Sequence, residues 1–237
     1  MTLFAFQIYG DFSGYSDIAI GCGKLFGIRL MRNFDHPYFA RDIAEFWRRW
    51  HISLTTWFRD YLYIPLGGSR CSKLKKVRNT FAIFLVSGIW HGANWTFLAW
   101  GAFHALLFLP LLLAGRNRKY LPGSAATLRD LPKMLLTFIL VVVGWTFFRA
   151  PDISAAFSWL AEMLSFSDLH GQGSGISTIR SAILPLLAML AIEWRSGAAA
   201  LPLLPKTAKS RLAVYCIAAL LVIFYPSAAQ TFIYFQF

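Results

Sequence analysis

Two histidines lie in sequence surroundings that suit proton transfer. His91 belongs to SGIWHGANW, residues 87–95, inside a run from Asn79 to Gly115 that contains no Asp, Glu, Lys or Arg. An unpaired ionisable group in hydrocarbon is costly, so a histidine in such a run is a functional candidate. A neutral imidazole in a dry cavity can take the proton of an attacking hydroxyl and return it to a leaving group, a general base and acid role worth roughly 10²- to 10⁴-fold.

The neighbours of His91 support that role on an uninterrupted helix. Ser87 lies four residues before His91 and Asn94 three residues after it, where their side chains would fix a tautomer. Gly88 and Gly92 would leave space for a substrate to approach the ring. A core histidine hydrogen-bonded to Ser87 explains the pattern equally well, and both interpretations stay open.

His51 is the second candidate and belongs to RDIAEFWRRWHISLTTWFRDYLY, residues 41–63. The spacing predicts one amphipathic helix at a membrane surface, with an aromatic face that points inward. That face comprises Trp47, Trp50, His51, Leu54, Phe58 and Tyr61. The opposite face places Arg41, Glu45 and Arg49 four residues apart and predicts ion pairs. A packed His51 that donates to a backbone carbonyl would fit the pattern as well as a catalytic one.

Carboxylates and small residues distinguish the first 30 residues, which we expect to form a helix or a broken pair of helices. Asp11 and Asp17 stand among apolar residues, and intramembrane carboxylates usually face a polar interior or a partner. Gly10 and Gly14 are four residues apart, a spacing that favours close helix packing over direct ligand binding.

The remaining histidines and the cysteines have less informative surroundings. We expect His104 to cap the apolar hairpin, His36 to lie in a turn before Pro37, and His170 to be solvated in a loop. The three cysteines are far apart in the sequence and predict neither a metal site nor a disulfide framework. The chain also lacks the GxSxG, HExxH and Hx₄D signatures of soluble enzymes.

The composition indicates that a bilayer surrounds these residues. The 237-residue chain is 57% hydrophobic and 14% charged, with a mean hydropathy of +0.52. That is more apolar surface than a soluble domain of this length buries. Predicted spans end near Gly115 or cover residues 134–148, 183–194 and 212–225.

The net charge of +12 indicates membrane topology and not nucleic-acid binding, because the basic residues cluster between apolar runs. A single helix over residues 79–115 would be about 55 Å long, too long for one crossing, so we expect a two-pass hairpin. All three basic clusters then lie on the cytoplasmic face, and residues 151–178, with a helix over 152–164, lie outside. The clusters are residues 70–78, 116–133 and 195–211.

Five blocks of sequence carry a resemblance to a known family. They are YGDFSGYSDIAIG (9–21), EFWRRWHISLTTWFRDYLYIPLGG (45–68), SGIWHGANWTFLAWGAFHA (87–105), GWTFFRA (144–150) and FIYFQF (232–237). In this order they resemble the membrane-bound O-acyltransferase (MBOAT) family, above all its bacterial alginate O-acetyltransferase subunits. The resemblance implies an all-α, polytopic integral membrane protein, a helical bundle around a funnel or tunnel with amphipathic interfacial helices. Since family members are longer, it implies that residues 1–237 are the C-terminal half of one MBOAT-like membrane domain.

The resemblance also implies a function in the bacterial inner (cytoplasmic) membrane, with several membrane passes. His91 matches the catalytic histidine of the family and His51 its second active-site residue, which orients or polarises a thioester carbonyl. The donor would be acetyl-CoA or another acyl thioester, with no bound cofactor and no metal. Hydroxyls of an exported polysaccharide such as alginate would accept the acyl group, helped by a periplasmic acetyltransferase partner. The supporting residues predicted for this site are Ser87, Asn94, Trp50, Asp11 and Asp17.

Two other functions compete with this one. A proton or solute transporter would use Asp11, Asp17, His51 and His91 as a path through the membrane. A truncated, non-catalytic fragment would instead assemble with the missing half. The acceptor stays open among alginate, cellulose, other exopolysaccharides and peptidoglycan.

Overall fold

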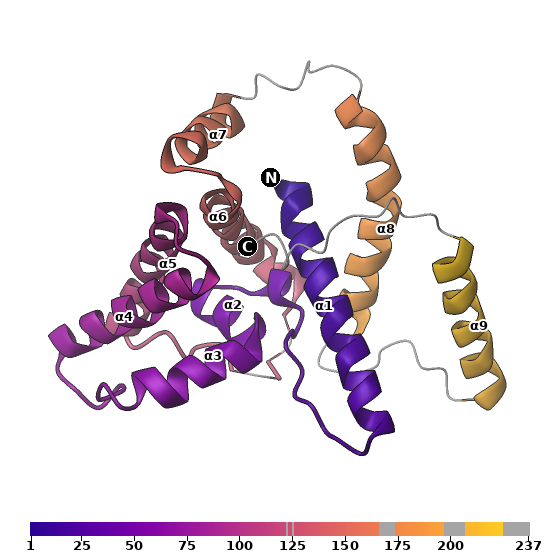
Figure 1. Ribbon diagram of the computed structural model, residues 1–237, viewed down its shortest axis with the longest axis horizontal. Helices are drawn as coiled ribbons and strands as arrows, with labels where there is room; N and C mark the ends of the chain where they lie inside the picture. The colour runs from indigo at the N-terminus through magenta and orange to yellow at the C-terminus, as the bar shows by residue number, and fades with distance from the viewer. Residues whose placement is uncertain (122, 125, 166–173, 197–206, 225–237) are drawn as a thin grey trace. The chain divides into compact units, whose positions relative to one another are not determined.

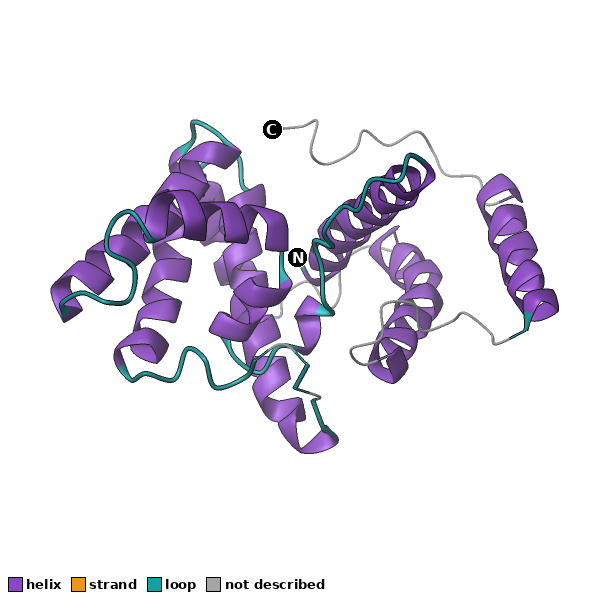
Figure 2. Ribbon diagram, turned by 90° about the horizontal axis from the view of Figure 1, so that it is seen from below, coloured by secondary structure: helices purple, strands orange, loops and turns teal. Residues whose placement is uncertain are grey.

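The computed structural model describes residues 1–121, 123–124, 126–165, 174–196 and 207–224. All regular structure within these residues is helical, with no β-strand, as Figure 2 shows. The all-α prediction is therefore confirmed. Chain contacts define two units, residues 1–172 and residues 173–237.

The first unit contains the two candidate histidines. Its helices are α1 (Thr2–Leu25), the 3₁₀ turn η1 (Pro37–Phe39), α2 (Ile43–Arg49), α3 (Ile52–Phe58), the π-helical turn η2 (Arg59–Tyr63), α4 (Lys73–His91), α5 (Trp95–Leu113), the 3₁₀ turn η3 (Leu128–Asp130), α6 (Leu131–Arg149) and α7 (Ile153–Ser165) (Figure 1). α5 packs between α4 and α6, while α1 packs against α6. The N-terminal segment thus forms one continuous helix, and α7 confirms the helix predicted over residues 152–164.

α4 and α5 form an antiparallel hairpin around a short link, residues 92–94. Glycines let the two backbones approach closely: a Cβ on Gly88 would lie 2.4 Å from the Phe97 carbonyl oxygen, and one on Gly101 would lie 2.3 Å from that of Phe84. The basic residues that open α4 and those that follow α5 therefore lie at one end of the hairpin. This arrangement agrees with the prediction that both basic clusters share one face.

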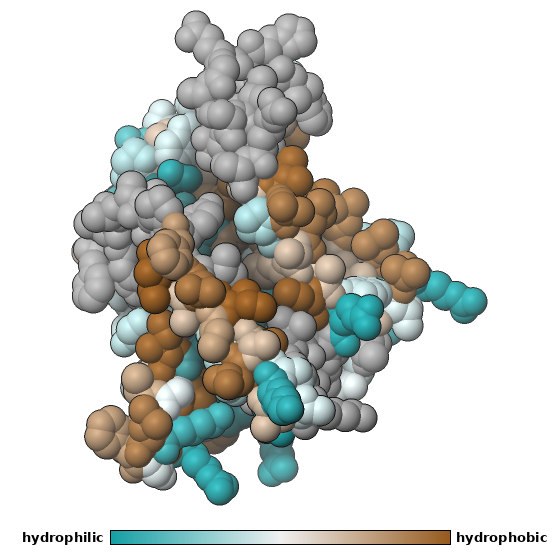
Figure 3. Space-filling view, turned by 90° about the vertical axis from the view of Figure 1, so that its right-hand side faces the viewer, coloured by the Kyte–Doolittle hydropathy of each residue, from teal (hydrophilic) through white to brown (hydrophobic). Residues whose placement is uncertain are grey.

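Two helices in the described residues are long and apolar enough to cross a membrane. They are Trp95–Leu113, which is α5, and Leu128–Arg149, which includes α6 and the predicted span over residues 134–148. α4, whose first turns carry the basic cluster, is not one of them, so a second crossing by this helix stays a prediction. Figure 3 shows apolar side chains, in brown, over much of the surface that it presents, as expected for a protein with apolar surroundings.

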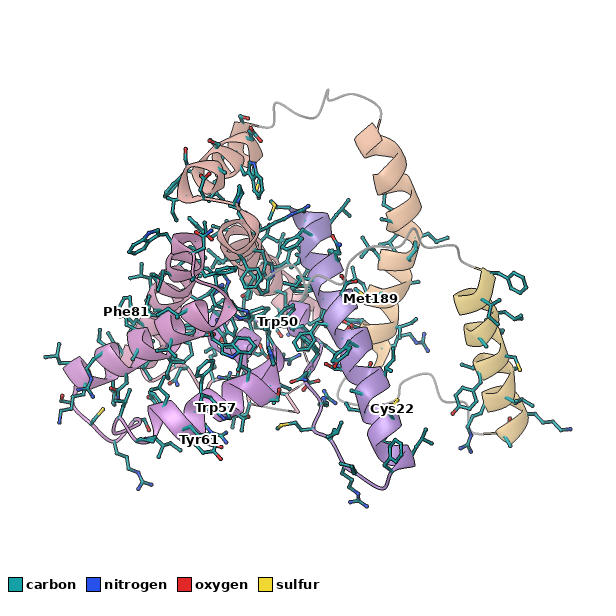
Figure 4. All side chains as sticks on the ribbon, viewed as in Figure 1. Cys22, Trp50, Trp57, Tyr61, Phe81 and Met189 are labelled. Carbon is teal, nitrogen blue, oxygen red and sulfur yellow. The ribbon has the colours of Figure 1, made fainter. Side chains whose placement is uncertain are left out.

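The prediction of one continuous helix over residues 41–63 is wrong. α2 ends where Trp50 takes an extended conformation, with φ −105° and ψ 129°, and α3 begins after His51, which is left-handed at φ 43°. Within the expected aromatic face, Trp50 and Phe58 are both buried, each with 4% of its surface exposed, whereas Tyr61 in η2 is 69% exposed. Trp57, which lies outside that face, is also exposed (Figure 4).

α2 is held in place by polar contacts that its sequence encodes. Asp42 caps the helix by accepting a hydrogen bond from the Glu45 backbone N–H at 2.7 Å. The predicted ion pairs are confirmed, since Glu45 Oε1 lies 2.7 Å from Arg41 and 2.6 Å from Arg49. Arg48 donates to two backbone carbonyls of the loop after α5, at 2.6 and 2.7 Å. These contacts fix the helix that leads into His51.

The second unit contains α8 (Ser174–Ser196) and α9 (Ala208–Phe224). α8 includes the predicted span over residues 183–194, and α9 includes all but the last residue of the span over 212–225. The loop prediction around His170 and the closing block at 232–237 lie outside the described residues. The assignment of residues 1–237 to one membrane domain stays a prediction.

Candidate active site

His51 lies at the break between α2 and α3, and a neighbouring loop stabilises its conformation. The His51 side chain forms no cap on α3. Asn33 takes that role: its backbone carbonyl accepts from the Ile52 N–H at 2.9 Å, and its side-chain Oδ1 accepts from the Ser53 N–H at 3.1 Å. Both early N–H groups of α3 are therefore satisfied from outside the helix.

The His51 ring is enclosed by polar and aromatic neighbours. Its Nδ1 lies 3.4 Å from the Ser53 hydroxyl. The Phe12 ring contacts it edge to face at 4.7 Å between centroids, and the Trp90 ring lies at 6.3 Å. Burial lowers the pKa of His51 to about 4, partly opposed by a hydrogen bond to its own backbone. The imidazole is therefore neutral near pH 7.

His91 is the last residue of α4, and its ring lies in an aromatic pocket. The centroids of Trp90, Phe148 and Trp100 lie 4.8, 4.9 and 5.3 Å from that of His91. Trp90 contacts both candidate rings, and the two imidazoles are close enough to interact electrostatically. The structure thus brings together the two histidines that are 40 positions apart in the sequence.

A stack of tryptophans also connects the two positions. Trp50, next to His51, lies 5.0 Å from Trp145, and Trp145 stacks on Trp100 at 6.2 Å. Trp100 in turn contacts the ring of His91 edge to face. All three tryptophans are at most 4% exposed. Trp50 therefore belongs to the buried aromatic core beside the two histidines, and its supporting role in the site stays a prediction.

The predicted hydrogen bonds from Ser87 and Asn94 to His91 are not present in the described part of the chain. α4 ends at His91, so Asn94 is not on the same helix but caps α5, accepting from the Thr96 N–H at 3.1 Å and donating to the Pro151 carbonyl at 2.9 Å. Ser87 is buried in the hairpin. Both residues shape the turn that carries His91, and neither fixes its tautomer.

The glycines beside His91 serve packing instead of substrate access. A Cβ on Gly88 would meet the Phe97 backbone, and one on Gly92 would lie 2.5 Å from the Phe97 ring. Phe97 thus fills the space that we expected to be open. A substrate must approach His91 from another side.

Asp11 and Asp17 do not join the two histidines. Both lie on α1, Asp17 exposed and Asp11 partly exposed, and neither forms an ion pair or side-chain hydrogen bond with any described residue. No hydrogen bond or ion pair links these four ionisable groups within the described residues, and the transporter alternative stays a hypothesis. No group of three or more His, Cys, Asp or Glu side chains suited to a metal occurs there either.

The prediction that His104 caps the hairpin is wrong, because His104 lies in the middle of α5 and is fully buried. Its ring contacts Trp47 at 4.9 Å and Trp100 at 5.2 Å. Neither ring nitrogen has a hydrogen-bond partner among the described residues. The nearby Gly144 leaves room for the ring, since a Cβ there would lie 2.5 Å from Nε2.

Comparisons with known proteins identify the family to which the chain belongs. The sequence model of MBOAT, the membrane-bound O-acyltransferase family, matches residues 1–128, which include both histidines. The chain is 49% identical over 162 residues to the probable alginate O-acetylase AlgI of Azotobacter vinelandii, covering 68% of this chain and 31% of that protein. It is 42% identical over 167 residues to the peptidoglycan O-acetyltransferase of Helicobacter pylori, covering 69% and 31%.

A more distant relative has a different acyl group in its name. The chain is 40% identical over 113 residues to the teichoic acid D-alanyltransferase of Streptococcus thermophilus, covering 45% of this chain and 27% of that protein. The aligned part spans less than a third of the length of each of these three relatives. The family match itself covers more than half of the present chain. The chain therefore belongs to the membrane-bound O-acyltransferase family.

Proposed function

We propose that this protein takes part in O-acyl transfer in the bacterial inner membrane, with several passes through the bilayer. An acetyl group would move from a cytoplasmic thioester, acetyl-CoA in the simplest case, toward hydroxyls of an exported polysaccharide such as alginate. A periplasmic acetyltransferase partner would assist this delivery, while the sugar hydroxyl itself would react in the membrane site. The names of the AlgI proteins and the peptidoglycan O-acetyltransferase support an acetyl group and a glycan acceptor.

One observation carries this proposal: the chain fold places His51 and His91 against a shared tryptophan, Trp90, on a rigid aromatic core. Two neutral imidazoles in an enclosed site suit general acid–base chemistry, because each can accept or donate a proton. Neither ring then carries a buried charge before the reaction begins. The edge-to-face contacts with Trp100 and Phe148 restrict the orientation of the His91 ring. Such restriction lowers the entropic cost of reaching a reactive geometry.

The reaction balances with His91 as the base. His91 accepts the proton of the attacking hydroxyl while the oxygen forms a bond to the thioester carbonyl carbon. The carbon–sulfur bond then breaks, and His91 returns the proton to the departing sulfur. His51 assists either by donating to the carbonyl oxygen or by accepting from a substrate hydroxyl. These alternatives require opposite tautomers at the nitrogen that faces the substrate.

The test is to replace His91 with alanine and measure ester content of the polysaccharide together with consumption of a radiolabelled acetyl thioester. We expect a loss of at least about 100-fold, with membrane insertion intact, because general acid–base catalysis is removed. The matched control is His104→Leu, which changes another histidine of the same hairpin. Unchanged ester content in His91→Ala would refute the assignment.

A further inference from the structure

We propose that Asn33 and Ser53 are positioning residues that hold His51 in the tautomer with its proton on Nδ1, so that Nε2 presents a lone pair to a substrate hydroxyl. The hydrogen bonds do not depend on any activity. Their role in catalysis rests on the proposed function and deepens it. They decide between the two roles left open for His51.

The orientation of the Asn33 amide follows from a backbone donor. The Ser53 N–H can only donate, and it lies 3.1 Å from one end of the amide, which must therefore be the oxygen Oδ1. The amide nitrogen then points the other way, where it donates to the Ser16 hydroxyl of α1 at 3.3 Å. Both ends of Asn33 are thus assigned without ambiguity.

The direction of the Ser53 hydroxyl follows next. Its oxygen lies 2.5 Å from Asn33 Oδ1, which has no proton to give. A serine hydroxyl has a single hydrogen, and that hydrogen is committed to Oδ1. Toward any other neighbour the Ser53 oxygen can only accept.

The tautomer of His51 is the consequence. Its Nδ1 lies 3.4 Å from the Ser53 oxygen, which offers a lone pair and no proton, so the favourable contact has the proton on Nδ1. A neutral imidazole carries one N–H, and Nε2 is then unprotonated. Burial keeps the ring neutral near pH 7, since the pKa of His51 falls to about 4.

An unprotonated Nε2 suits one of the two substrates and not the other. It can accept a hydrogen bond from a hydroxyl but cannot donate one to a thioester carbonyl. A sugar carries several hydroxyls, so one can give its proton to His91 while a neighbouring hydroxyl donates to His51. His51 therefore recognises the acceptor, and its polarising role toward the donor is not favoured.

The hydrogen bonds from Ser16 through Asn33 and Ser53 to His51 form a relay, and backbone contacts hold its members in place. Asn33 also holds the backbone of α3 through the Ile52 N–H at 2.9 Å, and the next loop residues pair with α2, since the Asp35 N–H donates to the Arg49 carbonyl at 3.0 Å. The relay thus joins Ser16 of α1, the loop and the first turn of α3.

Ser53→Ala is the decisive variant, because it removes the side-chain partner of Nδ1 while Asn33 still caps the backbone N–H groups of α3. The full chain, labelled with ¹⁵N-histidine in lipid nanodiscs, reports the tautomer of His51 by NMR. We expect Nδ1–H in the parent and a mixture in Ser53→Ala, with Ser53→Thr restoring the parent signal. An Nε2–H tautomer in the parent would overturn the proposal, whatever the activity.

Kinetics with acetyl-CoA and an alginate oligosaccharide separate the two substrates. Loss of one hydrogen bond predicts a roughly three- to tenfold rise in KM for the oligosaccharide in Ser53→Ala, with KM for acetyl-CoA unchanged. Ser53→Thr should recover the parent value. A rise confined to acetyl-CoA would overturn the proposal. The expected tautomer together with full activity in His91→Ala would instead reject the proposed function and leave the positioning intact.

Discussion

His51 and His104 both lie among aromatic rings, yet their surroundings differ in kind. His51 lies at a helix break, and a defined series of hydrogen bonds runs from Ser16 through Asn33 to its Nδ1. His104 lies in the middle of α5, fully buried, with no hydrogen bond to either nitrogen among the described residues.

The difference separates two ways in which a protein holds a histidine. Packing against Trp47 and Trp100 fixes where the ring of His104 lies but does not determine which of its nitrogens carries the proton. The polar contacts of His51 fix the position of the ring and the nitrogen that carries the proton. Chemistry needs the second kind of control, so the two residues should respond differently to crowding and to replacement.

The largest expected effect is the response of His51 to acid. The pKa of His51 is about 4 in the folded chain, below the ordinary value of 6.5, so between these values the unfolded chain binds a proton that the folded chain does not. The contribution of His51 is complete above pH 6.5 and is lost as the pH falls toward 4, by roughly 3 kcal/mol in all.

His51→Asn isolates this contribution, because asparagine does not titrate and tolerates a positive φ. Thermal unfolding in detergent between pH 7.5 and 4.5 should show that the variant loses less stability than the parent on acidification. Parallel losses in the two proteins would mean that His51 is protonated as readily in the folded state as in the unfolded one.

The sequence alone predicted much of this architecture but not the environment of His51. Uncharged runs identified α5 and α6, and spacing gave the Arg41–Glu45–Arg49 ion pairs. The break at His51 has no local signal, because neither proline nor glycine occurs between residues 41 and 63. It arises from contacts distant in sequence, with Trp145 packed on Trp50 and Asn33 bound to the first turn of α3.

The same limit explains why the site was only partly predicted. Asn33 and Ser53 are ordinary loop and helix-start residues, and only their meeting across 20 positions gives them a role. Spacing places Asn94 on the helix of His91, but asparagine is also a preferred N-cap residue, and in the structure it caps the start of α5. The sequence predicts His104 at the end of the hairpin, because an apolar run gives no signal that identifies the residue packed against Gly144.

Crowding at His104 should have the next largest effect. In Gly144→Ala the new Cβ would lie 2.5 Å from Nε2 of the fully buried His104, so the ring or the helix must shift. We expect a destabilisation of about 1 to 3 kcal/mol, measured by thermal unfolding in detergent. Gly10→Ala is the matched control, because no described atom lies within 4 Å of its new Cβ, and it should change stability by about 1 kcal/mol or less. Equal effects at both positions would show that His104 is loosely held.

The smallest expected effect is that of His104→Leu, which tests whether packing is all that this histidine provides. Leucine is of similar size and removes two buried nitrogens that have no partner among the described residues, so the lost ring contacts are offset by relief of desolvation. Stability should change by about 1 kcal/mol or less, and acyl transfer should stay within about twofold of the parent. A loss approaching that of His91→Ala would place His104 in the chemistry, since its two unpartnered nitrogens would then have a ligand to bind. Both histidines would then bind a partner, and they would differ in which partner each one binds.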